Sequence, residues 1–100
     1  MIPSFDTALD LRETIRLAAR NRRIALGLTQ SDLSGRSGVP LGTLKRFERL
    51  GEVSLTTLLA LAESLDALDG FHALFPLPEA RSLDDLERQS RMPQRARRRG

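Results

Sequence analysis

Residues 29–48 have the sequence TQSDLSGRSGVPLGTLKRFE, which contains the clearest local signals of secondary structure in the chain. Thr29 stands where a helix N-cap belongs, and Asp32, three residues later, can complete a weak capping box. These two residues predict a helix over Gln30–Ser37. That helix is short, because Gly38 follows it at a position where a tight turn needs positive φ.

The residues after this glycine predict a second short helix. Val39 points an apolar side chain inward, and Pro40 presets φ for the first turn of a helix that runs to about Arg49. Pro40 acts either as the first helical residue or only through its fixed φ. Two short helices joined through glycine form a helix-turn-helix signature.

Five apolar residues in and beside this motif lie at spacings that point them into one shared core. Each large side chain that becomes buried there contributes about 1.5 to 3 kcal/mol. We therefore interpret all five as structural: Leu28, Leu33, Val39, Leu44 and Phe47.

Helices are also expected on both sides of the motif, because no segment alternates apolar and polar residues as a strand does. Before it, a helix covers about 7–26, with Asp6 as its N-cap and Gly27 as its stop. After it, Ser54 is the N-cap of a helix over about 55–65. The chain is therefore predicted to be all-α. The first helix presents a mixed face made of Leu11, Ile15, Ala18, Ala19 and Arg22.

Composition excludes most catalytic sites. The chain has 100 residues, no cysteine and one histidine, so it provides one domain-sized core, no thiolate and no metal site made of histidines alone. It has no nucleophile with a base or electrophilic partner, and no glycine-rich phosphate loop. An enzyme, a metal site and a cofactor are not expected. A basic RNA-binding adaptor is weakly supported, because stacking residues such as Trp and Tyr are missing.

The sequence gives no sign of a membrane protein or of a secreted one. No apolar run approaches the roughly 20 residues of a membrane helix. Residues 1–10 lack the basic and apolar regions of a signal peptide. The expectation is a soluble, intracellular protein.

Charge is divided unevenly along the chain. Residues 12–49 have nine basic and three acidic side chains, residues 50–87 have one basic and eight acidic ones, and residues 88–100 have six arginines and no acid. A basic block attracts phosphate backbones because it releases their condensed counterions. The acidic half is repelled by DNA and is expected to face away from it.

The motif resembles the helix-turn-helix of the Cro and XRE-type bacterial and phage repressors. The resemblance covers about residues 11–65 and implies an all-α, five-helix Cro/lambda-repressor-like domain that binds DNA in the bacterial cytoplasm, associated with the nucleoid. It also implies a buried or half-buried ion pair between Arg23 and Glu48, although Arg23 could instead contact phosphate. The matching pattern is Thr29-Gln30-x-x-Leu33-Ser34-x-x-Ser37-Gly38-Val39-x-x-x-Thr43-Leu44-x-x-Phe47-Glu48.

In such proteins the second helix of the motif is the recognition helix, and its N-terminal half faces base edges in the major groove. Arg46 can donate two hydrogen bonds to a guanine, and Leu41 can pack on a thymine methyl. The alternative is that Lys45, Arg46 and Arg49 form only a solvated face. Pro40 stands where the family pattern has a serine or threonine that caps the recognition helix. We therefore expect fewer base contacts, with more of the specificity drawn from the shape of the DNA. The expected base contacts are Leu41, Gly42, Lys45 and Arg46, and the expected phosphate contacts are Thr29, Gln30 and Thr43.

Apolar surface beyond the motif favours a homodimer on a palindromic operator. The apolar residues of the helix over 55–65 span an arc of about 160°, which is wider than one neighbouring helix needs. They either complete the small core or form a shared interface, and a two-fold operator requires a dimer. His72 is expected at the surface or the interface, on a helix. The expected interface residues are Leu59, Leu68, Phe71, Leu74 and Phe75.

The C-terminal part is expected to be separate from a DNA-binding and dimerisation domain over residues 1–78. Ser82–Glu87 has a capping-box pattern and two spaced leucines, which predicts a short helix or docking segment within residues 79–100. The tail over 88–100 has almost no apolar residue and is expected to be disordered in isolation. It either contacts DNA, binds an acidic protein, or only solubilises the chain.

A narrower resemblance is to the HipB-like antitoxin subunits encoded beside HipA-family serine/threonine kinase toxins. It depends on residues 43–55, on Phe71-x-x-Leu-Phe-Pro and on Ser82-Leu-Asp-Asp-Leu. It implies autorepression of a toxin-antitoxin operon and a complex with a HipA- or HipT-like kinase, joined in the three-component HipBST form by a HipS-like small protein. The strand that pairs two-component HipB antitoxins across their dimer is not expected here. The alternative is a stand-alone dimeric repressor, phage or metabolic, with no toxin partner.

Overall fold

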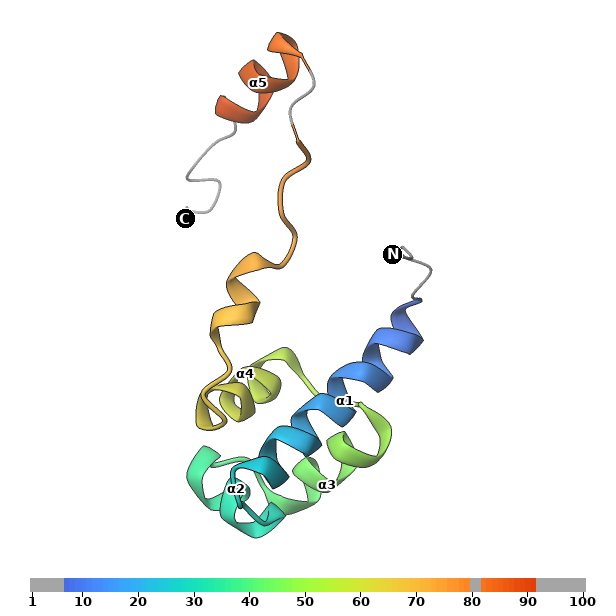
Figure 1. The fold of residues 1–100 in the computed structure, drawn as a ribbon, viewed down its shortest axis with the longest axis vertical. Helices are drawn as coiled ribbons and strands as arrows, with labels where there is room; N and C mark the ends of the chain where they lie inside the picture. The colour runs from blue at the N-terminus through green and yellow to red at the C-terminus, as the bar shows by residue number, and fades with distance from the viewer. Residues whose placement is uncertain (1–6, 80–81, 92–100) are drawn as a thin grey trace.

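The computed structural model describes residues 7–79 and 82–91, and within these ranges all regular structure is helical (Figure 1). The predicted all-α fold with five α-helices is confirmed. No helix among the described residues is both long and apolar enough to cross a membrane. Residues 92–100, the end of the predicted tail, lie outside the described residues. The elements are α1 (Ala8–Ala25), α2 (Gln30–Ser37), α3 (Leu41–Leu50), α4 (Leu55–Ser64), a 3₁₀ helix η1 (Asp69–Ala73) and α5 (Leu83–Ser90).

The N-cap of α1 is Thr7, so the prediction of Asp6 is wrong. The Thr7 hydroxyl accepts a hydrogen bond from the Asp10 main-chain N–H at 3.1 Å, and the Asp10 carboxylate accepts one from the Thr7 N–H at 3.2 Å. This reciprocal pair needs an acid three residues after the cap, which Thr7 has. Asp6 itself lies outside the described residues. The helix ends at Ala25, just before the predicted stop at Gly27, which has φ of 75°.

The motif folds as the sequence predicts. Thr29 caps α2 in a complete capping box with Asp32, and Gly38 ends the helix with φ of 79°. Pro40 is the N-cap of α3 and makes no side-chain cap hydrogen bond. Its φ of −57° already has the value that the following helix needs. Pro40 therefore acts through its fixed φ, and Leu41 is the first helical residue.

One apolar core holds α1 to α4 together. All five residues predicted for it are buried, and Leu44, Leu33 and Phe47 are exposed by 2% or less. Leu61 and Leu65 of the α4 region complete this cluster. In the resulting packing α2 contacts both α3 and α4, and α1 lies across α3.

The chain leaves this bundle after η1. His72 lies within η1, a 3₁₀ helix, and is exposed, whereas Leu74 and Phe75 come after the end of η1. Leu74 is extended, and Phe75 precedes a proline, which disfavours helical backbone at that residue. Figure 1 shows α5 standing apart from the bundle at the end of an extended segment.

Candidate DNA-binding surface

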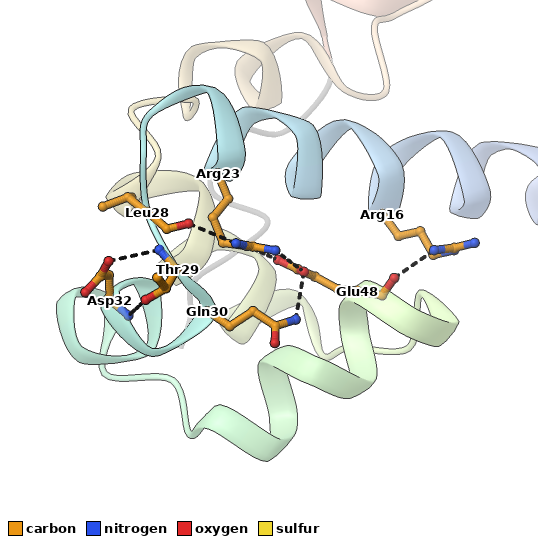
Figure 2. Close-up of polar contacts among 7 residues, drawn as sticks. All are labelled: Arg16, Arg23, Leu28, Thr29, Gln30, Asp32 and Glu48. Carbon is orange, nitrogen blue, oxygen red and sulfur yellow. Dashed lines mark hydrogen bonds and ion pairs between the residues drawn. The ribbon is translucent and has the colours of Figure 1, made fainter.

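The start of α2 is fixed by the Thr29–Asp32 capping box. The Asp32 carboxylate accepts from the Thr29 N–H at 2.9 Å, and the Thr29 hydroxyl accepts from the Asp32 N–H at 2.9 Å (Figure 2). Hydrogen bonds from Thr29 hold the pKa of Asp32 below its ordinary value. The carboxylate therefore stays ionised at neutral pH, beside the positive end of the helix dipole.

Two serines fix the turn between α2 and α3. The Ser34 hydroxyl donates to the Val39 carbonyl at 2.6 Å, and the Val39 N–H donates to the Ser37 hydroxyl at 3.1 Å. The Val39 side chain is buried beneath them, with 5% of its surface exposed. Since the polar groups of Val39 are satisfied and its side chain is packed, the angle between the two helices is rigidly set.

The predicted ion pair between Arg23 and Glu48 is confirmed, and it is buried. Arg23 donates from Nε to Glu48 Oε2 at 2.7 Å and from Nη2 to Oε1 at 2.9 Å (Figure 2). A third donor, Nη1, reaches the Leu28 carbonyl at 2.8 Å. The two residues are only 8% and 5% exposed, so Arg23 is part of the scaffold and is not free for phosphate.

Glu48 joins three helices at one residue. Burial raises the pKa of Glu48, but hydrogen bonds from Arg23 and Gln30 and the nearby arginine charges outweigh burial and lower the pKa. The Gln30 side-chain amide donates to Glu48 Oε1 at 2.9 Å, and Arg16 donates to the Glu48 carbonyl at 2.7 Å. Gln30, predicted to contact phosphate, thus has its side-chain donor directed into the protein.

The outer face of α3 contains the residues predicted to read bases. Gly42, Lys45 and Arg46 are exposed, whereas Leu41 is half-buried. Thr43, predicted to contact phosphate, is half-buried, and Thr29 is exposed. Helical spacing separates this face from the buried face of Leu44, Phe47 and Glu48.

Arg46 has an intramolecular partner that the sequence did not reveal. Its guanidinium pairs with Glu52 at 2.5 Å, and the two side chains are 58% and 47% exposed. Exposed ion pairs are worth at most about 1 kcal/mol. A guanine contact that needs Arg46 therefore competes with this pair at small cost.

A basic hollow of about 480 Å³ lies between α1 and α3 beside this face. Among the described residues, no ion pair joins Arg20, Lys45 or Arg49 to an acid. Arg16 and Arg20 were not singled out from the sequence, although their spacing of four places them on one face of a helix. Their approach to α3 depends on packing that no local pattern encodes. The lining residues are Arg16, Leu17, Arg20, Gln30, Lys45, Glu48 and Arg49.

The residues predicted for a dimer interface lie in two places. Leu59, Leu68 and Phe71 are half-buried on or next to the bundle. Leu74 and Phe75 lie on the extended segment, 56% and 94% exposed. The two groups together give the chain an apolar surface that its own fold does not cover.

Comparison with known families agrees with this geometry. A sequence model of the helix-turn-helix family matches residues 20–69, from the second half of α1 into η1. The chain belongs to the helix-turn-helix family. The match is of the Cro/C1, XRE type, a family of sequence-specific DNA-binding transcriptional regulators, which confirms the broader resemblance seen in the motif. No curated protein matches this helix-turn-helix chain.

Proposed function

We propose that this helix-turn-helix protein is a homodimeric transcriptional repressor that reads a palindromic operator through the outer face of α3. The observation that supports it best is the basic hollow beside that face, where Arg20, Lys45 and Arg49 have no acidic partner among the described residues. Unpaired cations next to a recognition helix fit the phosphates that flank a major groove.

Base reading falls to the exposed part of α3. Arg46 exchanges Glu52 for guanine O6 and N7, Leu41 meets a thymine methyl, and Lys45 lies between the bases and the hollow. Gly42 allows close approach but reads no base itself. This leaves few direct base contacts, so DNA shape contributes to the choice of site.

Phosphate binding uses the helix starts and the hollow. Thr29 and Thr43 present hydroxyls near the starts of α2 and α3. Gln30 contributes through its main-chain N–H, because that group lies in the first turn of α2 and has no partner within the helix. The cations of the hollow add the salt-dependent part of the affinity.

The test is quantitative footprinting of Arg46→Ala on the DNA upstream of the chain's own gene. Loss of a bidentate guanine contact is expected to cost about 1 to 3 kcal/mol of discrimination against mutated operators. Glu52→Ala is the matched control, because it frees Arg46 and is expected to leave discrimination intact or improve it. Unchanged discrimination in Arg46→Ala removes Arg46 as a base reader.

Arg49→Ala tests the hollow separately. Removing one phosphate contact is expected to lower the slope of log K against log salt by about 0.9, with the same effect on all sequences. Arg36→Ala, on α2 outside the hollow, is the control. An unchanged slope for Arg49→Ala excludes this residue from the DNA contact.

We further propose that the repressor is an antitoxin subunit that holds a HipA- or HipT-like kinase, with domains over 1–78 and 79–100. Residues 50–87 are acidic and α5 exposes Leu83 and Leu86, which fits a docking helix better than a DNA contact. The narrower sequence resemblance supports the same partner.

The partner is tested by repeating the footprint with and without the products of the adjacent genes. Protection of paired half-sites that strengthens with a kinase-like neighbour supports the antitoxin role. Protection that no neighbour alters contradicts that role and leaves a stand-alone repressor. A HipS-like protein is tested in the same way, as an addition to the kinase.

A further inference from the structure

Phe75 is presented to solvent in an unusual backbone conformation. Its side chain is 94% exposed and its φ is 57°, in the left-handed region that bulky residues rarely occupy. Pro76 follows directly, and a residue before proline normally adopts extended backbone. Such conformations persist where a contact compensates for them, and among residues 7–79 and 82–91 Phe75 remains 94% exposed.

The same chain contains a cavity of the size that Phe75 requires. It lies between α1 and α4, and its volume is about 180 Å³. Apolar cavities of about 150 Å³ bind benzene. The buried residues Leu61, Ala62 and Leu65 form its floor. Its walls include Ile15, Ala18, Leu58 and Phe71.

The one charged residue at this cavity does not disturb its apolar interior. The Arg22 guanidinium is held by the carbonyl oxygens of Leu65 at 2.6 Å and Asp66 at 2.8 Å. Its charge is therefore satisfied at the rim. The remaining lining offers a phenyl ring apolar contacts only, so an aromatic side chain fits it better than a polar ligand.

We propose that Phe75 of one copy inserts into the α1–α4 cavity of a second copy, and that the exchange is reciprocal. The inference rests on the proposed homodimer and names its central contact. Phe71, in the cavity wall, and Phe75 are four residues apart, so the inserted ring and the cavity are close neighbours on one surface. A two-fold axis beside this segment lets both insertions form together, which closes the assembly at two copies.

The first measurement is sedimentation equilibrium of the full chain and three variants. Phe75→Ala removes the ring, Ala18→Trp fills the cavity, and Leu55→Ala removes an exposed leucine outside the cavity as the control. The first two are expected to raise the dimer Kd at least about 100-fold, because two buried rings are lost per dimer. Leu55→Ala is expected to leave the Kd within about threefold of the wild type. Far-UV circular dichroism checks that each variant is folded.

A mixture of the two damaging variants then tests reciprocity. Phe75→Ala keeps a usable cavity and Ala18→Trp keeps its Phe75, so their heterodimer retains one of the two contacts. It is expected to form about tenfold more tightly than either variant associates with itself. No recovery in the mixture overturns the exchange and points to insertion of Phe75 within one chain.

Other outcomes separate this inference from the function it rests on. A wild-type dimer whose Kd is unchanged in both variants overturns the Phe75 contact and leaves the homodimer standing. A wild-type chain that stays monomeric, and binds the two half-sites of its operator independently, overturns the homodimer and the exchange together. Operator binding that needs the dimer but is lost in Phe75→Ala supports both.

Discussion

The bundle of α1 to α4 and the arm over residues 74–79 and 82–91 differ in what determines their conformation. In the bundle Leu33, Leu44 and Phe47 are almost fully buried, and the Arg23–Glu48 pair satisfies its charges internally. In the arm Phe75 is 94% exposed and Leu83 is 69% exposed. The bundle's own side chains specify its structure, whereas the arm has apolar side chains that the described residues leave exposed.

The hydrogen bonds that the structure describes for the helix of the arm are formed within the arm. The Ser82 hydroxyl accepts from the Asp85 N–H at 3.1 Å, and Gln89 donates to the Pro78 carbonyl at 2.8 Å. An isolated helix of eight residues is only marginally stable in water. The DNA-binding bundle is therefore held by its own core, whereas the helix of the arm lacks buried residues of its own.

The largest expected effect comes from breaking the bundle at Glu48. Glu48→Ala leaves the buried Arg23 guanidinium unpaired and is expected to lower the free energy of unfolding by about 3 to 5 kcal/mol. Urea denaturation measures this loss. Glu52→Ala, which breaks the exposed pair with Arg46, is the control and is expected to cost less than about 1 kcal/mol. Equal losses of unfolding free energy in the two variants would show that the buried Glu48 pair stabilises the fold no more than the exposed Glu52 pair.

Acid is expected to weaken the bundle through the same carboxylate. Folding lowers the pKa of Glu48, so its contribution to stability is complete above the ordinary glutamate pKa of about 4.3 and is lost as pH falls through the folded-state pKa. The loss is smaller than in Glu48→Ala, because the carboxyl group remains as a hydrogen-bonding group. Unfolding curves from pH 7 to 3 measure it, and Glu48→Gln is expected to flatten the dependence. An equally steep dependence in Glu48→Gln assigns the acid sensitivity to other carboxylates.

Gly42, within α3, and Gly51, the C-cap of α3, are expected to respond to substitution in opposite directions. Gly51 has φ of 76°, and an added Cβ would approach the Arg12 Cγ to 2.6 Å, so Gly51→Ala is expected to cost about 1 to 2 kcal/mol. Gly42 has open space around its Cα and lies within the helix, so Gly42→Ala is expected to stabilise by up to about 1 kcal/mol. Thermal unfolding of both variants compares them directly. The same sign for both would contradict the backbone roles assigned here.

The smallest expected effect tests whether bundle and arm are independent. Ser82→Ala removes the N-cap of α5 and is expected to shift the unfolding of the bundle by less than about 0.5 kcal/mol, even though α5 itself loses most of its helix. Amide hydrogen exchange resolves the two regions. Slower exchange in α5 than in α2 of the wild type, or a large shift of the bundle in Ser82→Ala, would show that they fold as one unit.

Most of the motif could be predicted because its signals are local. The Thr29 box, the Gly38 turn and the apolar spacing each act within a few residues, and the structure agrees with all three. Asp6 and Thr7 are adjacent residues of types that cap helices. Thr7 is the N-cap because Asp10, three residues after it, completes its capping box. The Arg23–Glu48 pair could be anticipated only through the family resemblance.

The rest of the surface depends on how helices pack. Gln30 turns its amide toward Glu48, and Arg46 reaches Glu52 six residues later, beyond the spacing of neighbours on a helix. The hollow between α1 and α3 combines residues as far apart in the sequence as Arg16 and Arg49. None of these contacts has a pattern in the sequence. The Gln30 contact and the hollow depend on the angles between helices that the core sets, and the Arg46–Glu52 pair depends on the course of the chain after α3.

The convergence of three helices on Glu48 limits how this protein can be regulated. A signal that tilted α3 while the bundle stayed folded would have to break the hydrogen bonds from Arg16, Arg23 and Gln30 together. We therefore expect an inducer that re-aims the helix to meet a large energetic cost. If the proposed repressor is a homodimer, we expect its release from DNA to depend on how many molecules the cell holds, on whether they are paired, and on what covers them.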